Sequence, residues 1–216
     1  QYEEPADAIR NLILVQRRDE MLHRVKDYRF RDWKDIKHDP EVINGRLLHN
    51  RVGYTMEDQL PLVLGLRGDP WLGPLEEELL EKIPKEGMSR MELFDGYPKG
   101  KENAHVQRSL KSALSNLERQ LVIGKKYIEL ANRKRSLAVF HRIQDRVKPM
   151  KFDEAVKTLI ERIGPVRLHT LRFFVSRPVE ELAETLRDLE NAGKIARVVA
   201  LQPDPTDYYS SHEDAE

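Results

Sequence analysis

The feature that most constrains this chain is an order of helices and strands that occurs twice in its last two thirds. The first copy contains three helices and then two strands, predicted over residues 75–83, 90–94, 103–121, 121–128 and 137–143. The second copy repeats this order, with predicted ranges 152–163, 168–175, 179–192, 195–201 and 207–210. The repetition predicts two related modules rather than one large core.

Capping residues and helical periodicity support these elements. Ser89 is a good N-cap for the short helix of the first copy, and Ser176 is the N-cap predicted for the long helix of the second, which Gly193 ends. The helix over 103–121 places six apolar residues on one side, at spacings of three, four and seven: Val106, Leu110, Ala113, Leu114, Leu117 and Leu121. A helix, a short helix, a long helix and a hairpin form the order of a winged helix.

We therefore predict a mainly α structure with small β-hairpins, of the α+β class, built from tandem winged-helix domains. Glycine and proline residues at 65–74 and 148–149 mark the boundaries. The predicted domains are 1–69, a helical segment with a hairpin, 70–149, a basic winged helix, and 150–216, an acidic one. Within the first domain we expect a helix over 6–37, a hairpin over 42–55, and a helix over 55–66 that Thr55 caps.

Composition excludes several classes of function. The chain has no Cys, which removes disulfides and thiolate sites, and no apolar stretch approaches the roughly 18 residues of a membrane-spanning helix. Its seven His show no metal-ligand spacing, and no glycine-rich phosphate loop is present, so we expect no metal and no cofactor. We expect a cytoplasmic (nucleoid) or otherwise intracellular protein. The first residue is Gln and no signal peptide is evident, so we expect a fragment or a processed chain.

The net charge of zero hides a polarised distribution. Residues 99–151 contain 14 Lys and Arg against 4 Asp and Glu, a formal charge of +10, whereas residues 1–98 and 152–216 each carry −5. A basic block of this kind is typical of a surface that binds a polyanion, although a contiguous solvated basic face is the alternative. Double-stranded DNA is therefore the expected partner of the middle domain.

The candidate DNA contacts lie on the long helix of the basic domain and around it. A step of 100° per residue puts two Arg and two Ser opposite the apolar side, where they could enter a major groove; an ordinary solvent-facing surface is the alternative. Further cations lie in the preceding turn, on the first wing strand and at the wing tip. The candidates are Lys99, Lys101, His105, Arg108, Ser112, Ser115, Arg119, Lys125, Lys126, Arg133, Lys134 and Arg135.

The corresponding helix of the last domain has the opposite charge. The sequence VEELAETLRDLENA contains five acidic residues against Arg187 alone, so this face repels phosphate. We expect this domain to serve packing or contact with a protein partner instead of reading DNA.

Four stretches of the sequence carry a family resemblance. They are GRLLHNRVGYTMEDQLPLVLGL, LERQLVIGKKYIELANRKRSLAVFHRIQDRVKP, FDEAVKTLIERIGPVRLHTLRFF and the closing DYYSSHEDAE. These stretches resemble the AlkZ-type winged-helix DNA glycosylases, which have a hairpin and the following helix at the place of the first stretch. The resemblance implies tandem winged helices that form a basic DNA-binding scaffold, and excision of alkylated or crosslinked purines. It extends from about Asn44 to the C-terminus.

Two positions differ from what the resemblance implies about catalysis. The family has a catalytic Gln-containing motif in its N-terminal part, whereas Gln16 is flanked here by Arg residues. The family's hairpin carries a His where this chain has Val52, and His49 lies three residues upstream. No catalytic residue is therefore assigned. We expect a DNA-binding protein related to DNA-repair glycosylases, with an active glycosylase and a winged-helix regulator or protein-interaction module as the alternatives.

Overall fold

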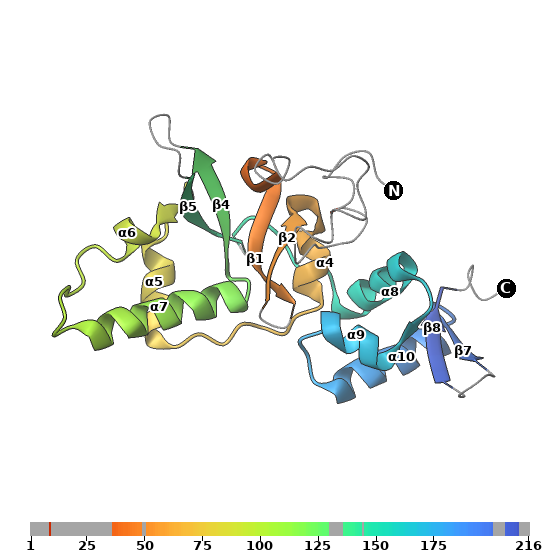
Figure 1. Ribbon diagram of the computed structural model, residues 1–216. Helices are drawn as coiled ribbons and strands as arrows, with labels where there is room; N and C mark the ends of the chain where they lie inside the picture. Colours follow the sequence, from red (N-terminus) through yellow and green to blue (C-terminus); the bar gives the residue numbers. More distant parts are fainter. Residues whose placement is uncertain are drawn as a thin grey trace. The chain divides into compact units, whose positions relative to one another are not determined.

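The computed structural model describes residues 9, 36–48, 51–129, 136–143, 145–200 and 206–211. It separates into two compact units, which we describe one at a time (Figure 1). Unit 1 comprises residues Gln1–Gln59 and Pro70–Lys148, and unit 2 comprises Leu60–Asp69 and Pro149–Glu216.

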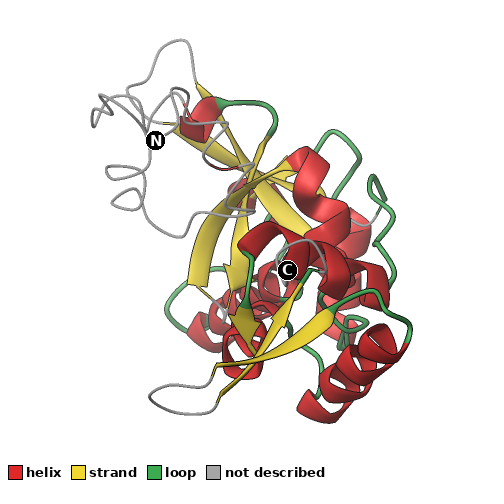
Figure 2. Ribbon diagram, turned by 90° about the vertical axis from the view of Figure 1, so that its right-hand side faces the viewer, coloured by secondary structure: helices red, strands yellow, loops and turns green. Residues whose placement is uncertain are grey.

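Unit 1 combines a five-stranded antiparallel sheet with helices. The strands lie in the order β2-β1-β4-β5-β3, and Figure 2 shows them in yellow. Their bounds are β1 (Val42–Leu48), β2 (Arg51–Met56), β3 (Met88–Ser89), β4 (Ile123–Glu129) and β5 (Ser136–Arg142). The helical elements are η1 (Glu57–Gln59), α5 (Pro74–Lys82), α6 (Arg90–Leu93) and α7 (Ala104–Arg119).

Local chemistry explains why the helices of unit 1 begin where they do. Pro74 lies in the first turn of α5, where its missing N–H costs no hydrogen bond. Ser89 caps α6 through a complete capping box: its hydroxyl accepts from the N–H of Glu92, and the Glu92 carboxylate accepts from the N–H of Ser89. The apolar side of α7 packs beside α5 and against the sheet, forming a core that includes Leu79, Leu110, Leu117 and Phe140.

Unit 2 has the same order of elements after one additional helix. Its helices are α4 (Leu60–Gly65), α8 (Phe152–Ile163), α9 (Leu168–Phe174) and α10 (Val179–Asn191). Its strands are β6 (Val166–Arg167), β7 (Ala196–Ala200) and β8 (Thr206–Ser210), in the order β6-β8-β7. Buried aliphatic residues of α8, α9 and α10 form the core, among them Leu159, Leu171 and Leu186.

The α+β fold class with small hairpins is confirmed. In each unit a short strand between the first two helices of the repeated order pairs with the last strand, as β3 pairs with β5 and β6 with β8. In unit 1 the hairpin of β1 and β2 extends this sheet, because β1 pairs with β4 at Asn44 and Lys125. No helix in the described part of the chain is long and apolar enough to cross a membrane.

Two predicted caps are wrong. Thr55 is fully buried within β2, opposite Ile43, and the chain continues through η1 before α4 begins at Leu60, so no helix starts at Thr55. The N-cap of α10 is Pro178, not Ser176, and no side chain caps that helix. The helix predicted over 6–37 lies almost entirely outside the described residues.

Candidate nucleic-acid interface

The exposed face of α7 has the composition that the helical periodicity predicts. Arg108, Ser112 and Arg119 are exposed and Ser115 is half-buried, on the side of the helix opposite the buried Leu117. His105 is exposed near the N-terminal end of α7. We call Arg108, Ser112, Ser115 and Arg119 the exposed α7 face. Its short hydroxyl side chains leave room between the two Arg, which offer several donors each to an approaching polyanion.

Two further predicted cations lie in the turn before α7. The ammonium of Lys99 pairs with the carboxylate of Asp95 at 2.9 Å, with both side chains largely exposed to water. An exposed pair of this kind contributes at most about 1 kcal/mol, so Lys99 can exchange Asp95 for another anion at little cost. Lys101 is also exposed.

Lys125 and Lys126, which were predicted on the first wing strand, lie on opposite faces of β4, because side chains alternate along a strand. Lys126 pairs with Glu57 at 2.9 Å and donates to the backbone carbonyl of Pro40 at 2.6 Å. These two contacts connect β4 to segments of the chain that precede α5. Lys126 therefore has a structural role in unit 1, whether or not it also meets DNA.

Lys125 forms an ion pair on the other face. Its ammonium lies 3.0 Å from the carboxylate of Glu118 on α7, and the two side chains are 18% and 9% exposed. The same ammonium lies 5.9 Å from the ring centroid of Phe140. The three cations predicted at the wing tip, Arg133, Lys134 and Arg135, lie outside the described residues.

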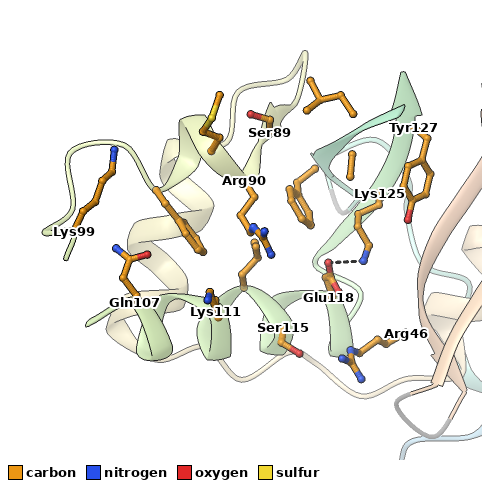
Figure 3. Close-up of a pocket in the computed structure, with 16 residues that line it drawn as sticks. Arg46, Ser89, Arg90, Lys99, Gln107, Lys111, Ser115, Glu118, Lys125 and Tyr127 are labelled. Atoms are coloured by element: carbon orange, nitrogen blue, oxygen red, sulfur yellow. Dashed lines mark ion pairs between the residues drawn. The ribbon is translucent and has the colours of Figure 1, made fainter. Parts of the chain in front are cut away.

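An open groove of about 790 Å³ lies beside the exposed α7 face, within unit 1 (Figure 3). One wall is a second strip of α7, and α6 forms the opposite wall; β4, β5 and Arg46 of β1 complete it. The polar residues that line the groove are Arg46, Ser89, Arg90, Lys99, Gln107, Lys111, Ser115, Glu118, Lys125 and Tyr127. The apolar ones are Met91, Phe94, Leu114, Leu137, Ala138 and Phe140.

Strand register explains why the sheet side of the groove contains these residues. Lys125 pairs with Phe140 and Tyr127 pairs with Ala138, so the four side chains share one face of the sheet. Asn44 of β1 pairs with Lys125, which places Arg46, two residues further on, at the same face. The sheet therefore presents cations and rings together.

The groove has a positive charge. Five of its lining residues are cations and one, Glu118, is an acid. Figure 3 shows Arg90 extending from α6 toward α7, with Arg46 near the Glu118–Lys125 pair at one end and Lys99 at the other.

Two phenols of this sheet have raised pKa values. Burial raises the pKa of Tyr127, and the nearby Glu118 carboxylate adds to the shift. Burial also raises the pKa of Tyr54 to about 12, with a smaller contribution from Tyr127. Both phenols are neutral hydrogen-bond donors at neutral pH.

Three of the residues predicted from the sequence line this groove, and several other lining residues were not predicted. Lys99, Ser115 and Lys125 line it, whereas Lys101, His105, Arg108, Ser112, Arg119 and Lys126 do not. Gln107 and Lys111 were not predicted, although Gln107, Lys111 and Ser115 follow one another at a spacing of four and so mark a second polar strip of α7. No local pattern connects Arg46 or Arg90 with that strip.

The exposed side of α10 in unit 2 is acidic. Glu180, Glu184 and Asp188 are exposed, and Arg187 is the cation on this helix.

The residues considered for catalysis give no assignment. Val52, which stands where the resembling family has a His, is 44% exposed on β2 and pairs with Arg46. Gln16 and His49 lie outside the described residues. In the described part of the chain no three His, Asp or Glu side chains come together as a metal site would require.

Comparison with known proteins finds similarity at the level of structure and not of sequence. No protein-family model matches the sequence, and no curated protein matches it significantly. Among solved structures, the Streptomyces sahachiroi DNA glycosylase AlkZ is similar, with a TM-score of 0.69 over 98% of this chain and 16% sequence identity. The chain spans 66% of the length of AlkZ. At this identity the match shows that the two proteins share a fold.

Proposed function

We propose that this chain is a DNA-binding protein whose two units act as tandem winged helices, and that unit 1 binds duplex DNA. The observation that carries the proposal is the exposed α7 face, where Arg108 and Arg119 flank two small hydroxyl residues. A helix with this face fits a major groove, in which Arg donates to guanine edges or to phosphate oxygens. Lys99, Lys101 and His105 add positive or hydrogen-bonding groups beside the entry to the helix.

The charge distribution supports unit 1 as the unit that binds. The basic block at 99–151 belongs to unit 1 apart from its last three residues, whereas the exposed side of α10 in unit 2 is acidic. Lys and Arg side chains that neutralise DNA phosphates release the counterions condensed on the DNA, whereas carboxylates repel the phosphates. The fold shared with a DNA glycosylase is consistent with a role on DNA.

The test is fluorescence anisotropy with a labelled duplex at several salt concentrations. We expect the logarithm of the association constant to fall linearly with the logarithm of the salt concentration, with a slope of about −0.9 for each phosphate contacted. Arg108→Ala and Arg119→Ala should each weaken binding by about 1 to 3 kcal/mol. Their melting temperatures should change little, because both side chains lie away from the core.

The matched control is Arg187→Ala, which removes an exposed arginine from α10 of unit 2. Its affinity for the duplex should equal that of the unmodified protein. A duplex affinity that does not respond to salt, or an equal loss of affinity in all three variants, would contradict the proposal.

The fold shared with the DNA glycosylase AlkZ favours one second candidate, base excision from DNA. The family resemblance of the sequence implies alkylated or crosslinked purines as the bases removed. Base excision requires a polar group that positions water at the sugar, and the aliphatic side chain of Val52 neither donates nor accepts a hydrogen bond. We therefore propose binding without excision. Release of a 7-alkylated purine from duplex DNA, scored as abasic sites, would establish the second candidate, and loss of that release in His49→Ala would place the reaction at the hairpin.

A further inference from the structure

The groove beside α7 combines two properties that an ordinary duplex-binding surface does not need together. Its polar residues supply five cations from α6, α7, β1, β4 and the turn before α7. Its remaining surface is apolar, with Leu114, Ala138 and Phe140 among the lining residues. A ligand that satisfies both is an anion with a flat apolar part.

The cations approach the space from different sides. Arg90 extends from α6 and Lys111 from α7, so their side chains lie on opposite walls (Figure 3). Both are exposed. A phosphate between two such walls would receive hydrogen bonds from a guanidinium and an ammonium, which are stronger than bonds from neutral donors.

The sheet side offers surfaces on which a base could stack. Tyr127 is a half-buried ring that shares one face of the sheet with Ala138, whose small side chain leaves space beside it. The ammonium of Lys37 lies 3.8 Å from the centroid of the Tyr127 ring, as cations do over aromatic faces. Phe140 is only 5% exposed and forms the apolar floor of the groove. Every nucleobase has a π face, so stacking on aromatic rings binds bases with little sequence preference. The volume of about 790 Å³ lies within the range of roughly 300 to 1,000 Å³ of small-ligand sites, which suits a part of one strand and not a duplex.

The groove is continuous with the exposed α7 face. Ser115 belongs to both, and Lys111 lies about 60° around the helix from Arg108 at 100° per residue. We propose that the groove binds about one or two unpaired nucleotides of a strand whose paired part lies against the exposed α7 face. This inference rests on the proposed duplex binding and names its substrate class: duplex DNA with a bulge, a gap or a single-stranded end.

The position of the groove favours nucleic acid over an acidic peptide as its ligand. Both ligands are anionic, but a strand held at the exposed α7 face is already in contact with the residue that begins the groove. Its next phosphates are spaced along the backbone, as the cations are spaced along the groove from Arg46 to Lys99. The acidic peptide is one outcome of the test.

The experiment compares two labelled duplexes of the same sequence, one perfect and one with a two-nucleotide bulge that contains 2-aminopurine. We expect the full chain to bind the bulged duplex about tenfold more tightly, and the 2-aminopurine fluorescence to fall as the base stacks. Arg90→Ala and Lys111→Ala should remove most of this preference. Ala138→Phe fills the groove without changing its charge and should remove both the preference and the fluorescence change.

Lys85→Ala is the control for charge, since Lys85 is an exposed cation of unit 1 that does not line the groove. It should keep the tenfold preference. If the protein binds neither duplex at low salt, the proposed function fails. If it binds both equally, or if the groove variants weaken both equally, only the groove proposal is overturned. Displacement of the bulged strand by a polyglutamate peptide, without displacement of the perfect duplex, would show that the groove takes acidic peptides instead.

Discussion

The ion pair between Glu118 and Lys125 predicts opposite changes in stability and in nucleic-acid affinity. Glu118 is the one acid among the groove-lining residues, and its side chain is 9% exposed. The perturbation is Glu118→Gln, which keeps the size of the side chain and removes its charge. The unfolded state should be little affected, so the change reports the folded protein.

The magnitude follows from the burial of the pair. Removing one partner of a buried ion pair costs about 3 to 5 kcal/mol, because the other charge stays without compensation. The glutamine amide oxygen can still accept a hydrogen bond from Lys125, and a bond to a charged group contributes roughly 1.5 to 3 kcal/mol. Lys125 is 18% exposed, so its ammonium also gains some water. We expect a net loss of about 2 kcal/mol in the free energy of unfolding.

Affinity for the bulged duplex should change in the other direction. Glu118→Gln removes the negative charge from the groove and replaces the ion pair of Lys125 by a hydrogen bond to a neutral amide, from which a phosphate can attract the ammonium. One exposed ion pair contributes about 1 kcal/mol, which is close to a fivefold increase in affinity. The salt dependence should steepen by about 0.7 in logarithmic slope, the value for one more phosphate of a single strand.

The assays are urea unfolding followed by far-UV circular dichroism, and anisotropy with the bulged duplex. Glu81→Gln is the matched control, because Glu81 is an exposed acid on α5 outside the groove. It should change neither measurement by much. Unchanged stability in Glu118→Gln would refute the calculation from burial, and weaker binding would refute the idea that the acid opposes a phosphate in the groove.

Three further predictions concern the stability of unit 1. Ser89→Ala breaks the capping box with Glu92 and should lower the free energy of unfolding by about 1 kcal/mol, measured by urea unfolding, with Ser112→Ala on the exposed side of α7 as a neutral comparison. Gly87→Ala should cost about 1 to 3 kcal/mol in the same assay, because Gly87 has a φ of +90° and an added Cβ would lie 2.4 Å from Cε1 of His141. Burial and the positive charge of Arg146 lower the pKa of His141 below 6.5, so the unfolded state binds this proton first as pH falls. The unmodified protein should therefore lose melting temperature relative to His141→Gln between about pH 7 and pH 5, and parallel pH profiles would contradict the shift.

Local signals predicted most helices because the forces that define them lie within one or two turns. The bounds of α8 match the predicted helix over 152–163, since its apolar residues recur with helical spacing and Gly164 follows its last residue. Thr55 shows the limit of such signals. A Thr three residues before Asp58 resembles a helix cap, but pairing of β2 with β1 continues past that point, and the strand partner is not visible in a local window.

The candidate site divides in the same way. A step of 100° per residue is enough to place Arg108, Ser112 and Arg119 on the exposed side of α7. Helical periodicity could not predict the groove. Arg46 and Arg90 lie far from α7 in the sequence, and the pairing of the strands brings them to it. The alternation of side chains along β4 predicts that Lys125 and Lys126 point to opposite faces of the sheet. It does not predict that their ion-pair partners are Glu118 and Glu57.

The two units share their order of elements, so the proposal that unit 1 binds DNA rests on their exposed side chains and not on that order. In both, a short strand pairs with the last strand and a long amphipathic helix precedes the hairpin. The buried sides of α7 and α10 are alike, with Leu114 and Leu117 in one and Leu182 and Leu186 in the other. Their exposed sides carry opposite charge, and only exposed side chains meet a ligand. The exposed side of α7 attracts phosphate and that of α10 repels it, so the same internal packing is compatible with opposite responses to a polyanion.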